Sequence, residues 1–163
     1  MRAMNMNVEL KKATTKDAEE LLKLMCDYYS YEGLEFNKFD SQKTLVDILS
    51  SDGYGIVDLI LVDSHIAGYL CMTYGYSLEY FGRDCILDEI YVVPQYQRKG
   101  IGSCVLKLIE KQLNEKGFKA IHLEVFDKNK HALDFFAKNG FTVHKSSFMS
   151  KKMLGSRDKR RHD

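Results

Sequence analysis

The 163-residue sequence has little of several features that mark particular protein classes. It contains one proline, Pro94, and no tryptophan, and its four cysteines form no Cys-x-x-Cys pair and have no histidine at metal-ligand spacing. This pattern argues against a disulfide scaffold or a metal site and favours reduced thiols in the cytoplasm. No run approaches the roughly 18 apolar residues of a membrane span, and the first residues lack the apolar stretch of a signal peptide. We therefore expect a cytoplasmic protein with no membrane partner.

The charges of the chain nearly cancel. Lys and Arg number 24 and Asp and Glu number 23, which gives a net charge of +1. Bulk charge therefore offers no reason to expect a nucleic-acid partner. Residues 154–163 form a basic tail without interleaved aromatic residues, and we expect a solvated end rather than a nucleic-acid arm. A chain of this length has room for one domain of ordinary size.

Hydrophobic periodicity predicts ten elements in the order β-α-α-β-β-β-α-β-α-β. The expected strands cover residues 8–12, 56–62, 66–74, 85–93 and 121–126, with a last strand from Phe141. The expected helices run from a cap at residues 14–17 to about Tyr29, from a cap at Asp40 or Ser41 to Leu49, and over residues 100–116 and 129–138. The two strands at 56–62 and 66–74 should pair antiparallel through the turn at 63–65.

The most informative segment is a strand, a basic glycine-bearing turn and a helix over residues 88–103. Gly100 and Gly102 allow backbone N–H groups to converge on an anion, and the helix N-terminus adds partial positive charge. Arg98 and Lys99 strengthen the same field. A dinucleotide fingerprint would need glycine at Val105, and a P-loop would need Gly-Lys-Ser/Thr, which is absent. The turn therefore predicts a phosphate site of another kind.

The run Gln97-Arg98-Lys99-Gly100-Ile101-Gly102 resembles the Gln/Arg-x-x-Gly-x-Gly/Ala acetyl-CoA motif of the GNAT family of N-acetyltransferases. The later pattern Ala132-Leu133-Asp134-Phe135-Phe136-Ala137-Lys138-Asn139-Gly140-Phe141 lies in the context that the family shows. The resemblance covers residues 8–153, and it implies one N-acetyltransferase domain. The implied fold is α/β (α+β), a mixed central sheet with splayed fourth and fifth strands and helices on its flanks.

The same resemblance implies acetyl-CoA as cofactor. It assigns the pyrophosphate to the turn, and the pantetheine and acetyl carbonyl to the end of the preceding strand. The implied cofactor-binding residues are Ile90, Tyr91, Val92, Gln97, Arg98, Lys99, Gly100, Ile101, Gly102, Ser103, Asn129 and Phe136. Asn129 fits a helix N-cap equally well.

Acetyl transfer to an amine that is protonated near neutral pH needs a proton acceptor. Asp88 and Glu89 are the candidate catalytic residues, and the resemblance places Asp88 at the catalytic Glu of the polyamine acetyltransferases. Adjacent strand residues point to opposite faces unless the strand bulges, so we expect one of them to face the cleft and slightly prefer Asp88. Phe136 stands where many family members have a tyrosine that protonates the CoA thiolate, so a water would have to serve here.

The acceptor site implied by the resemblance includes an aromatic and acidic stretch. Its candidate substrate-binding residues are Tyr28, Tyr31, Glu32 and Glu35, which suit a small cationic amine. Cys104, His122, His131 and His144 are expected to be structural or surface residues rather than catalytic ones. We predict direct transfer from acetyl-CoA to a polyamine-like, aminoglycoside-like or amino-acid-like amine. A non-catalytic acetyl-CoA sensor is the alternative, and a homodimer is left open.

Overall fold

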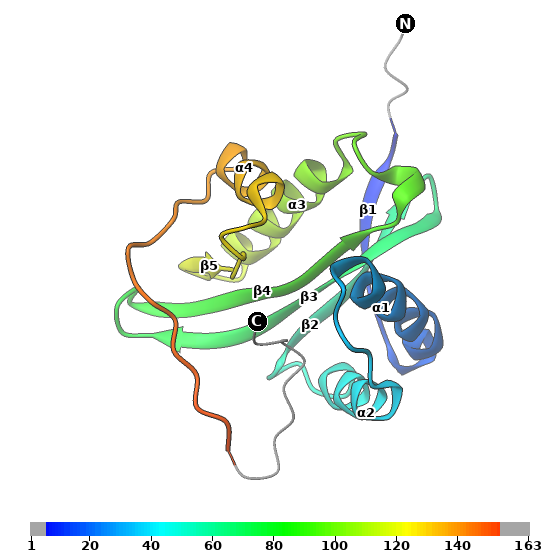
Figure 1. Cartoon of the computed structure of the whole chain (residues 1–163), viewed down its shortest axis with the longest axis horizontal. Coiled ribbons are helices and arrows are strands. Elements are labelled where there is room, and N and C mark those ends of the chain that lie inside the picture. The colour runs from blue at the N-terminus through cyan, green and yellow to red at the C-terminus, as the bar shows by residue number, and fades with distance from the viewer. Residues whose placement is uncertain (1–5, 154–163) are drawn as a thin grey trace, which may run out of the picture.

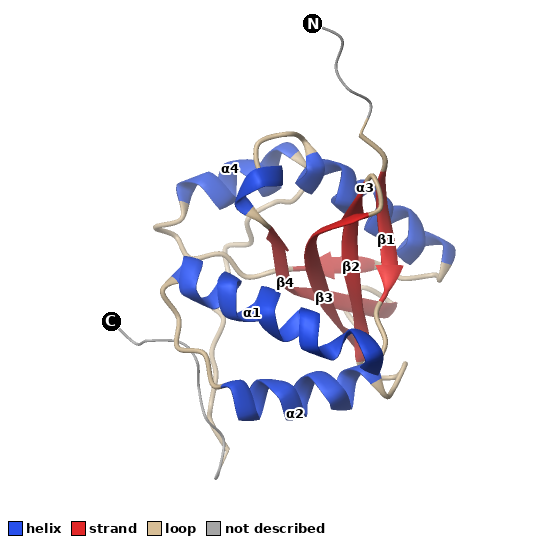
Figure 2. Ribbon diagram, turned by 90° about the vertical axis from the view of Figure 1, so that its right-hand side faces the viewer, coloured by secondary structure: helices blue, strands red, loops and turns tan. Residues whose placement is uncertain are grey.

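The computed structural model describes residues 6–153 and consists of a central sheet with two helices on each face (Figures 1 and 2). The basic tail expected at residues 154–163 lies outside the described residues. Among the described residues, no helix is long and apolar enough to cross a membrane.

The sheet has five strands in the spatial order β1-β2-β3-β4-β5. Their bounds are Val8–Lys12, Gly55–Val62, His65–Ser77, Gly82–Val92 and Ala120–His122. Neighbouring strands are antiparallel except β4 and β5, which are parallel. The mixed sheet and the antiparallel β2–β3 hairpin are confirmed. Asp63 and Ser64 turn the hairpin with φ angles of 49° and 67°, the left-handed values that a tight two-residue turn requires.

Three strand predictions need correction. The loop expected between residues 75 and 84 is much shorter, because β3 and β4 remain paired as far as Ser77 and Gly82. The strand expected over 121–126 is only β5, since its pairing with β4 ends at Ile86 and His122. The last strand expected from Phe141 is absent from the described chain, because residues 141–153 pair with no strand there.

The four helices are α1 (Ala18–Glu32), α2 (Lys38–Leu49), α3 (Ile101–Glu115) and α4 (Lys130–Lys138). The cap predicted for α2 at Asp40 or Ser41 is wrong. Asn37 is the N-cap, and its side-chain oxygen accepts a hydrogen bond from the amide of Asp40 at 3.1 Å. The first helix ends at Glu32, three residues later than expected. Gly33 is its C-cap, and the φ of 68° there suits a glycine.

Two hydrophobic cores lie on opposite faces of the sheet. On one face, α3 buries Val105, Ile109 and Leu113 against residues of β2, β3 and β4. On the other face, α1 and α2 bury Leu21, Met25 and Leu45 against alternate residues of the same strands. Each large apolar side chain that is fully buried contributes about 1.5–3 kcal/mol. Since both faces are covered, β2 is buried along almost its whole length.

Candidate active site

A β-bulge interrupts β4 at Asp88. Glu89 pairs with Cys71 of β3, and the next pair joins Leu87 to Met72, so Asp88 is an additional residue that the register passes over. Leu87 belongs to the core on the α3 face, whereas Tyr91 belongs to the core on the α1 face. The bulge therefore reverses the alternation of side chains along the strand.

Two buried tyrosines hold Glu89. Tyr29 of α1 donates its phenol hydrogen to Oε1 at 2.6 Å, and Tyr69 of β3 donates to Oε2 at 2.7 Å. Burial raises the pKa of both phenols well above the ordinary value, and the charge of Glu89 raises them further. Both tyrosines therefore remain protonated donors at neutral pH. The two hydrogen bonds fix the carboxylate in a half-buried position beneath α1.

Three carboxylates lie close enough to Tyr28 to act on its hydroxyl. Burial raises the pKa of Tyr28, and the charges of Glu32, Glu89 and Asp88 raise it further, in that order. Asp88 is exposed, whereas Glu32 and Glu89 are half-buried. The structure thus brings together Tyr28, Glu32 and both catalytic candidates in one acidic, aromatic group. Such a group attracts an ammonium ion through its charges and through its ring faces.

Aromatic rings surround these carboxylates. The Tyr28 ring lies 5.8 Å from that of Tyr91 and 6.4 Å from that of Tyr69, measured between centroids. Tyr31, another predicted substrate residue, is 64% exposed, and its ring centroid lies 6.4 Å from that of Tyr91. The fourth, Glu35, is exposed on the segment after α1 and is not among the charges that act on Tyr28.

The predicted phosphate turn joins β4 to α3 through the short 3-10 helix η2 (Pro94–Tyr96). Gln97 donates its side-chain amide to the carbonyl of Val92 at 2.8 Å, which ties the turn to the end of β4. Arg98 and Gly100 have φ angles of 58° and 79°. Arg98, Lys99 and Gly100 are exposed, so the backbone and both cations are accessible to an anion.

The first turn of α3 packs closely on α4. Ile101 is buried in the core at 2% exposure, whereas Gly102 and Ser103 are half-buried. A Cβ at Gly102 would approach the ring of Phe135 to 3.0 Å, so a glycine here lets α4 lie against α3. This contact positions α4 against the N-terminus of α3.

Beyond the pair of Ile86 and His122, β4 and β5 separate. Ile90, Tyr91 and Val92 pair with β3 on one side. Their other edge has no strand partner among residues 6–153, because β5 is paired only as far as His122. The splay predicted between the fourth and fifth strands is therefore present, and it leaves this edge of β4 without a neighbouring strand beside the phosphate turn, where the Val92 carbonyl accepts from Gln97.

Asn129 and Phe136 both have structural contacts. The Asn129 side-chain oxygen accepts a hydrogen bond from the amide of Ala132 at 3.1 Å, so it caps α4. Phe136 packs between Phe135 and Phe141, with ring centroids 5.0 and 5.5 Å away. No phenol hydroxyl stands at this position.

The three histidines and the cysteine that were expected to be structural or surface residues lie outside the acidic, aromatic group. His122 Nε2 is 3.4 Å from Oδ2 of Asp84, at the start of β4, and His131 and His144 are exposed. Cys104 is half-buried in α3.

Sequence reasoning did not select Tyr29 and Tyr69, the two donors to Glu89. The signal available for Tyr69 was its place in a strand of apolar residues, which predicts burial. A buried tyrosine hydroxyl normally has a hydrogen-bond partner. No spacing rule identifies that partner, because Tyr69 and Glu89 meet only when β3 and β4 pair.

Comparisons with known proteins agree with this geometry. Residues 18–141 match the model of the Acetyltransferase (GNAT) family. The chain is 30% identical over 147 residues to thialysine N-epsilon-acetyltransferase of Bos taurus, covering 82% of this chain and 83% of the relative. It is 27% identical over 153 residues to spermidine N(1)-acetyltransferase of Thermoplasma acidophilum, covering 85% and 90%.

The fold is also that of a solved aminoglycoside N-acetyltransferase, AAC(6')-Iy, in complex with CoA. The TM-score is 0.75 with 12% identity, covering 93% of this chain and 99% of that one. The splayed strands and the glycine turn agree with the match of the family model. This chain therefore belongs to the GNAT family of acetyl-CoA-dependent N-acetyltransferases.

Proposed function

We propose that the enzyme acetylates a primary amine of a small polycationic molecule, of the polyamine or diamine class. The observation that carries this proposal is the group formed by Tyr28, Glu32, Asp88 and Glu89, in which three carboxylates lie close enough to raise the pKa of one phenol. A substrate with two or more ammonium groups gains from several carboxylates at once. The names of the relatives, thialysine and spermidine acetyltransferases, support the same class.

For the cofactor, we propose that the turn over residues 97–103 holds the pyrophosphate of acetyl-CoA. Exposed amides around Gly100 and the positive end of α3 would meet the phosphates, with Arg98 and Lys99 adding charge. The edge of β4 at Ile90, Tyr91 and Val92, which faces no strand in the described chain, would bind the pantetheine arm and orient the acetyl carbonyl. Gln97 would act by positioning the turn.

Two further residues complete this proposal for the cofactor site. Asn129 would present the start of α4 to the pantetheine arm while its own oxygen caps that helix. Phe136 would contribute apolar packing near the thioester rather than a proton.

For the reaction, we propose direct attack of the neutral amine nitrogen on the acetyl carbon. The ammonium first gives one proton to Asp88, directly or through a water, because Asp88 is exposed at the bulge and both Glu89 oxygens already accept phenol hydrogens. The new C–N bond forms, and the attacking nitrogen releases its second proton to solvent. The C–S bond breaks, and the CoA thiolate takes a proton from solvent. Glu89 contributes negative charge that holds the ammonium.

A covalent acyl-enzyme is not needed. Cys71, which pairs with Glu89, is the cysteine of this region, and burial raises its thiol pKa, with Asp88 and Glu89 raising it further. The protonated thiol is a poor nucleophile at neutral pH. We therefore propose transfer in a ternary complex of enzyme, acetyl-CoA and amine.

We also propose one catalytic domain over residues 8–153, a cytoplasmic location and a homodimer. None of the cysteines at 26, 71, 85 and 104 is in a disulfide, as expected in a reducing compartment. Val143, Phe148 and Met149 are more than 70% exposed on the extended segment after α4, and a second copy would cover them. Sedimentation at increasing concentration would reveal the dimer.

The amine class is tested by mass spectrometry of products from a panel of spermidine, putrescine, thialysine, lysine, an aminoglycoside and a neutral monoamine. We expect the highest kcat/KM for a substrate with two or more cationic groups. Equal turnover of the monoamine, or CoA binding without any acetylated product, would contradict the proposal.

A further inference from the structure

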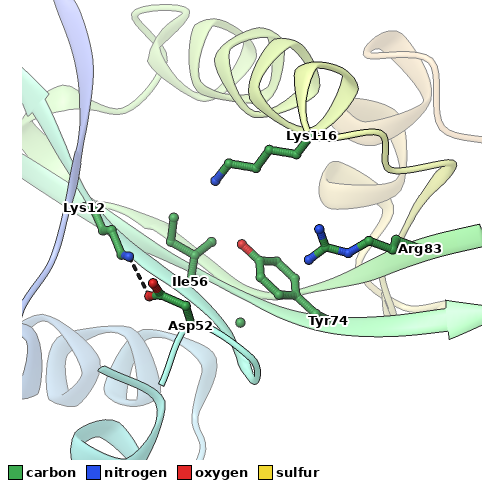
Figure 3. A pocket seen from close by; sticks show the side chains of 7 residues that line it. Lys12, Asp52, Ile56, Tyr74, Arg83 and Lys116 are labelled. Atoms are coloured by element: carbon green, nitrogen blue, oxygen red, sulfur yellow. Dashed lines mark hydrogen bonds and ion pairs between the residues drawn. The ribbon is translucent and has the colours of Figure 1, made fainter. Parts of the chain in front are cut away.

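A pocket lies at the end of the sheet opposite the phosphate turn. Its volume is about 220 Å³, and Figure 3 shows the side chains around it. It is lined by Lys12, Asp52, Gly55, Ile56, Tyr74, Arg83 and Lys116. Lys116 follows the last residue of α3, whereas the phosphate turn precedes its first residue. A helix of this length separates the two by about 22 Å.

Cations predominate among the residues of this basic pocket. Lys12 Nζ is 2.6 Å from Oδ1 of Asp52, the only acidic residue of the lining. Arg83 and Lys116 have no carboxylate within ion-pair distance in the part of the chain that the structure describes. Figure 3 shows both side chains extending toward the space beside the Tyr74 hydroxyl. The pocket therefore has two cations and a hydroxyl to offer to an anion.

Arg83 is held in place by aromatic rings. Its guanidinium carbon lies 4.2 Å from the centre of the Phe118 ring and 5.4 Å from that of Tyr74. These contacts fix the plane of the guanidinium, and its N–H groups remain available at the edge. A fixed guanidinium is suited to binding two oxygens of a carboxylate or phosphate.

A buried carboxylate lies next to this pocket. Asp58 is opposite Lys12 in the β1–β2 register and two residues after Ile56, which places it on the face of β2 that lines the pocket. It is 1% exposed, and neither carboxylate oxygen has a hydrogen-bond partner within residues 6–153. Burial raises its pKa to about 6, and the charges of Lys116 and Lys12 oppose that rise. Asp58 and the pocket lysines are therefore electrostatically coupled.

We propose that the basic pocket binds a small oxyanion, a phosphate or a short dicarboxylate, between Arg83 and Lys116 with the Tyr74 hydroxyl as a further donor. The volume is below that of pockets that enclose cofactors and drug-sized ligands, which favours a small anion. An anion there neutralises the lysine charges that favour ionised Asp58. Binding near pH 6 therefore takes up a proton at Asp58.

The test is isothermal titration of inorganic phosphate and, separately, succinate into protein saturated with CoA, which occupies the phosphate turn. We expect saturable binding of at least one of the two anions, and the two titrations distinguish phosphate from dicarboxylate. The double variant R83Q/K116Q should bind it at least tenfold more weakly, whereas K107Q/K111Q, on exposed positions of α3, should bind as the original chain does. Binding that is absent, or equally strong in both double variants, would overturn the proposal.

Two additional measurements guard against loss of folding and against nonspecific charge effects. K116Q alone changes a residue after the helix and should still weaken binding, with an unchanged circular dichroism spectrum. Titrations at pH 6 in buffers of different ionisation enthalpy should show proton uptake that D58N abolishes while anion binding persists. Proton uptake that is unchanged in D58N would contradict the coupling to Asp58.

Discussion

Tyr69 on β3 donates its phenol hydrogen to Oε2 of Glu89 on β4 over 2.7 Å. The bulge at Asp88 makes this contact possible, because it directs Glu89 toward the face that carries Tyr69. Tyr29 holds the other oxygen from α1, so one carboxylate joins the sheet to a helix.

Removing the Tyr69 hydroxyl should impair Glu89 without removing any ring packing. Tyr69→Phe leaves one Glu89 oxygen with one fewer donor, which costs about 1–3 kcal/mol of stability. Hydrogen bonds from phenols favour the ionised carboxylate, so losing one should shift the acid limb of kcat/KM toward higher pH. Stopped-flow rates across pH measure this. Tyr54→Phe, at an exposed tyrosine, should leave the profile unchanged, and an unshifted limb in Tyr69→Phe would show that Glu89 does not influence catalysis.

Amide variants should distinguish the roles of the two neighbouring carboxylates. Asp88→Asn removes the proposed proton acceptor, and kcat should fall by about 10²–10⁴-fold. Glu89→Gln keeps hydrogen-bonding capacity and should chiefly raise KM for a polycationic amine. Steady-state kinetics with varied amine measures both constants. If the larger fall in kcat belongs to Glu89→Gln, the roles are reversed.

A side chain at Gly100 should weaken CoA binding. Gly100→Val places a Cβ where the pyrophosphate would approach, and the affinity should drop at least tenfold, or about 1.4 kcal/mol. Backbone strain alone is controlled by Gly117→Val, because Gly117 has a similar φ, 75° against 79°, and open space around it. Calorimetry with CoA measures both variants. Equal affinity of Gly100→Val and the original chain would remove the cofactor assignment of this turn.

Replacing the α3 cysteine should change little. Cys104→Ala removes a half-buried thiol from the helix behind the phosphate turn, and most of the kcat should remain, since no acyl-cysteine is proposed. Intact-mass spectrometry during turnover should show no protein acetyl adduct. Loss of activity in a folded Cys104→Ala protein would favour a covalent route.

The buried Asp58 should make stability depend on pH. Its pKa is about 6 in the folded chain against 3.8 ordinarily, so between these values the unfolded state is ionised while the folded state is protonated. Stability should therefore fall as pH rises through this window, by about 3 kcal/mol in all.

The stability difference between Asp58→Asn and the original chain isolates this effect. It should be about 3 kcal/mol more favourable to the variant at pH 7.5 than at pH 3.5. Urea unfolding in buffers without phosphate or carboxylate measures it. Asp52→Asn, which changes an exposed partner of Lys12, should show no such gain, and a difference independent of pH in Asp58→Asn would contradict the argument.

Local patterns in the sequence determined most of the elements and indicated the turn that we propose for the cofactor. The alternation over residues 8–12 predicted β1 with its observed bounds, and Pro94 marked the end of β4 because proline cannot continue a strand ladder. Gly100 and Gly102 indicated the turn because the conformational freedom of glycine acts locally, within a few residues of the chain. Asp88 and Glu89 were identified through the resemblance to the GNAT family and the need for a proton acceptor.

Only the tertiary structure decided where those carboxylates lie and which groups contact Glu89. The bulge at Asp88 is a property of two paired strands, and the donors to Glu89 are 20 and 60 residues away in sequence. The shortening of β5 likewise depends on where β4 separates from it, and the basic pocket joins the ends of strands and helix distant in the chain. Hydrophobic periodicity predicts which face of a helix or strand is buried. These contacts depend instead on which residues of other elements lie opposite that face in the folded chain.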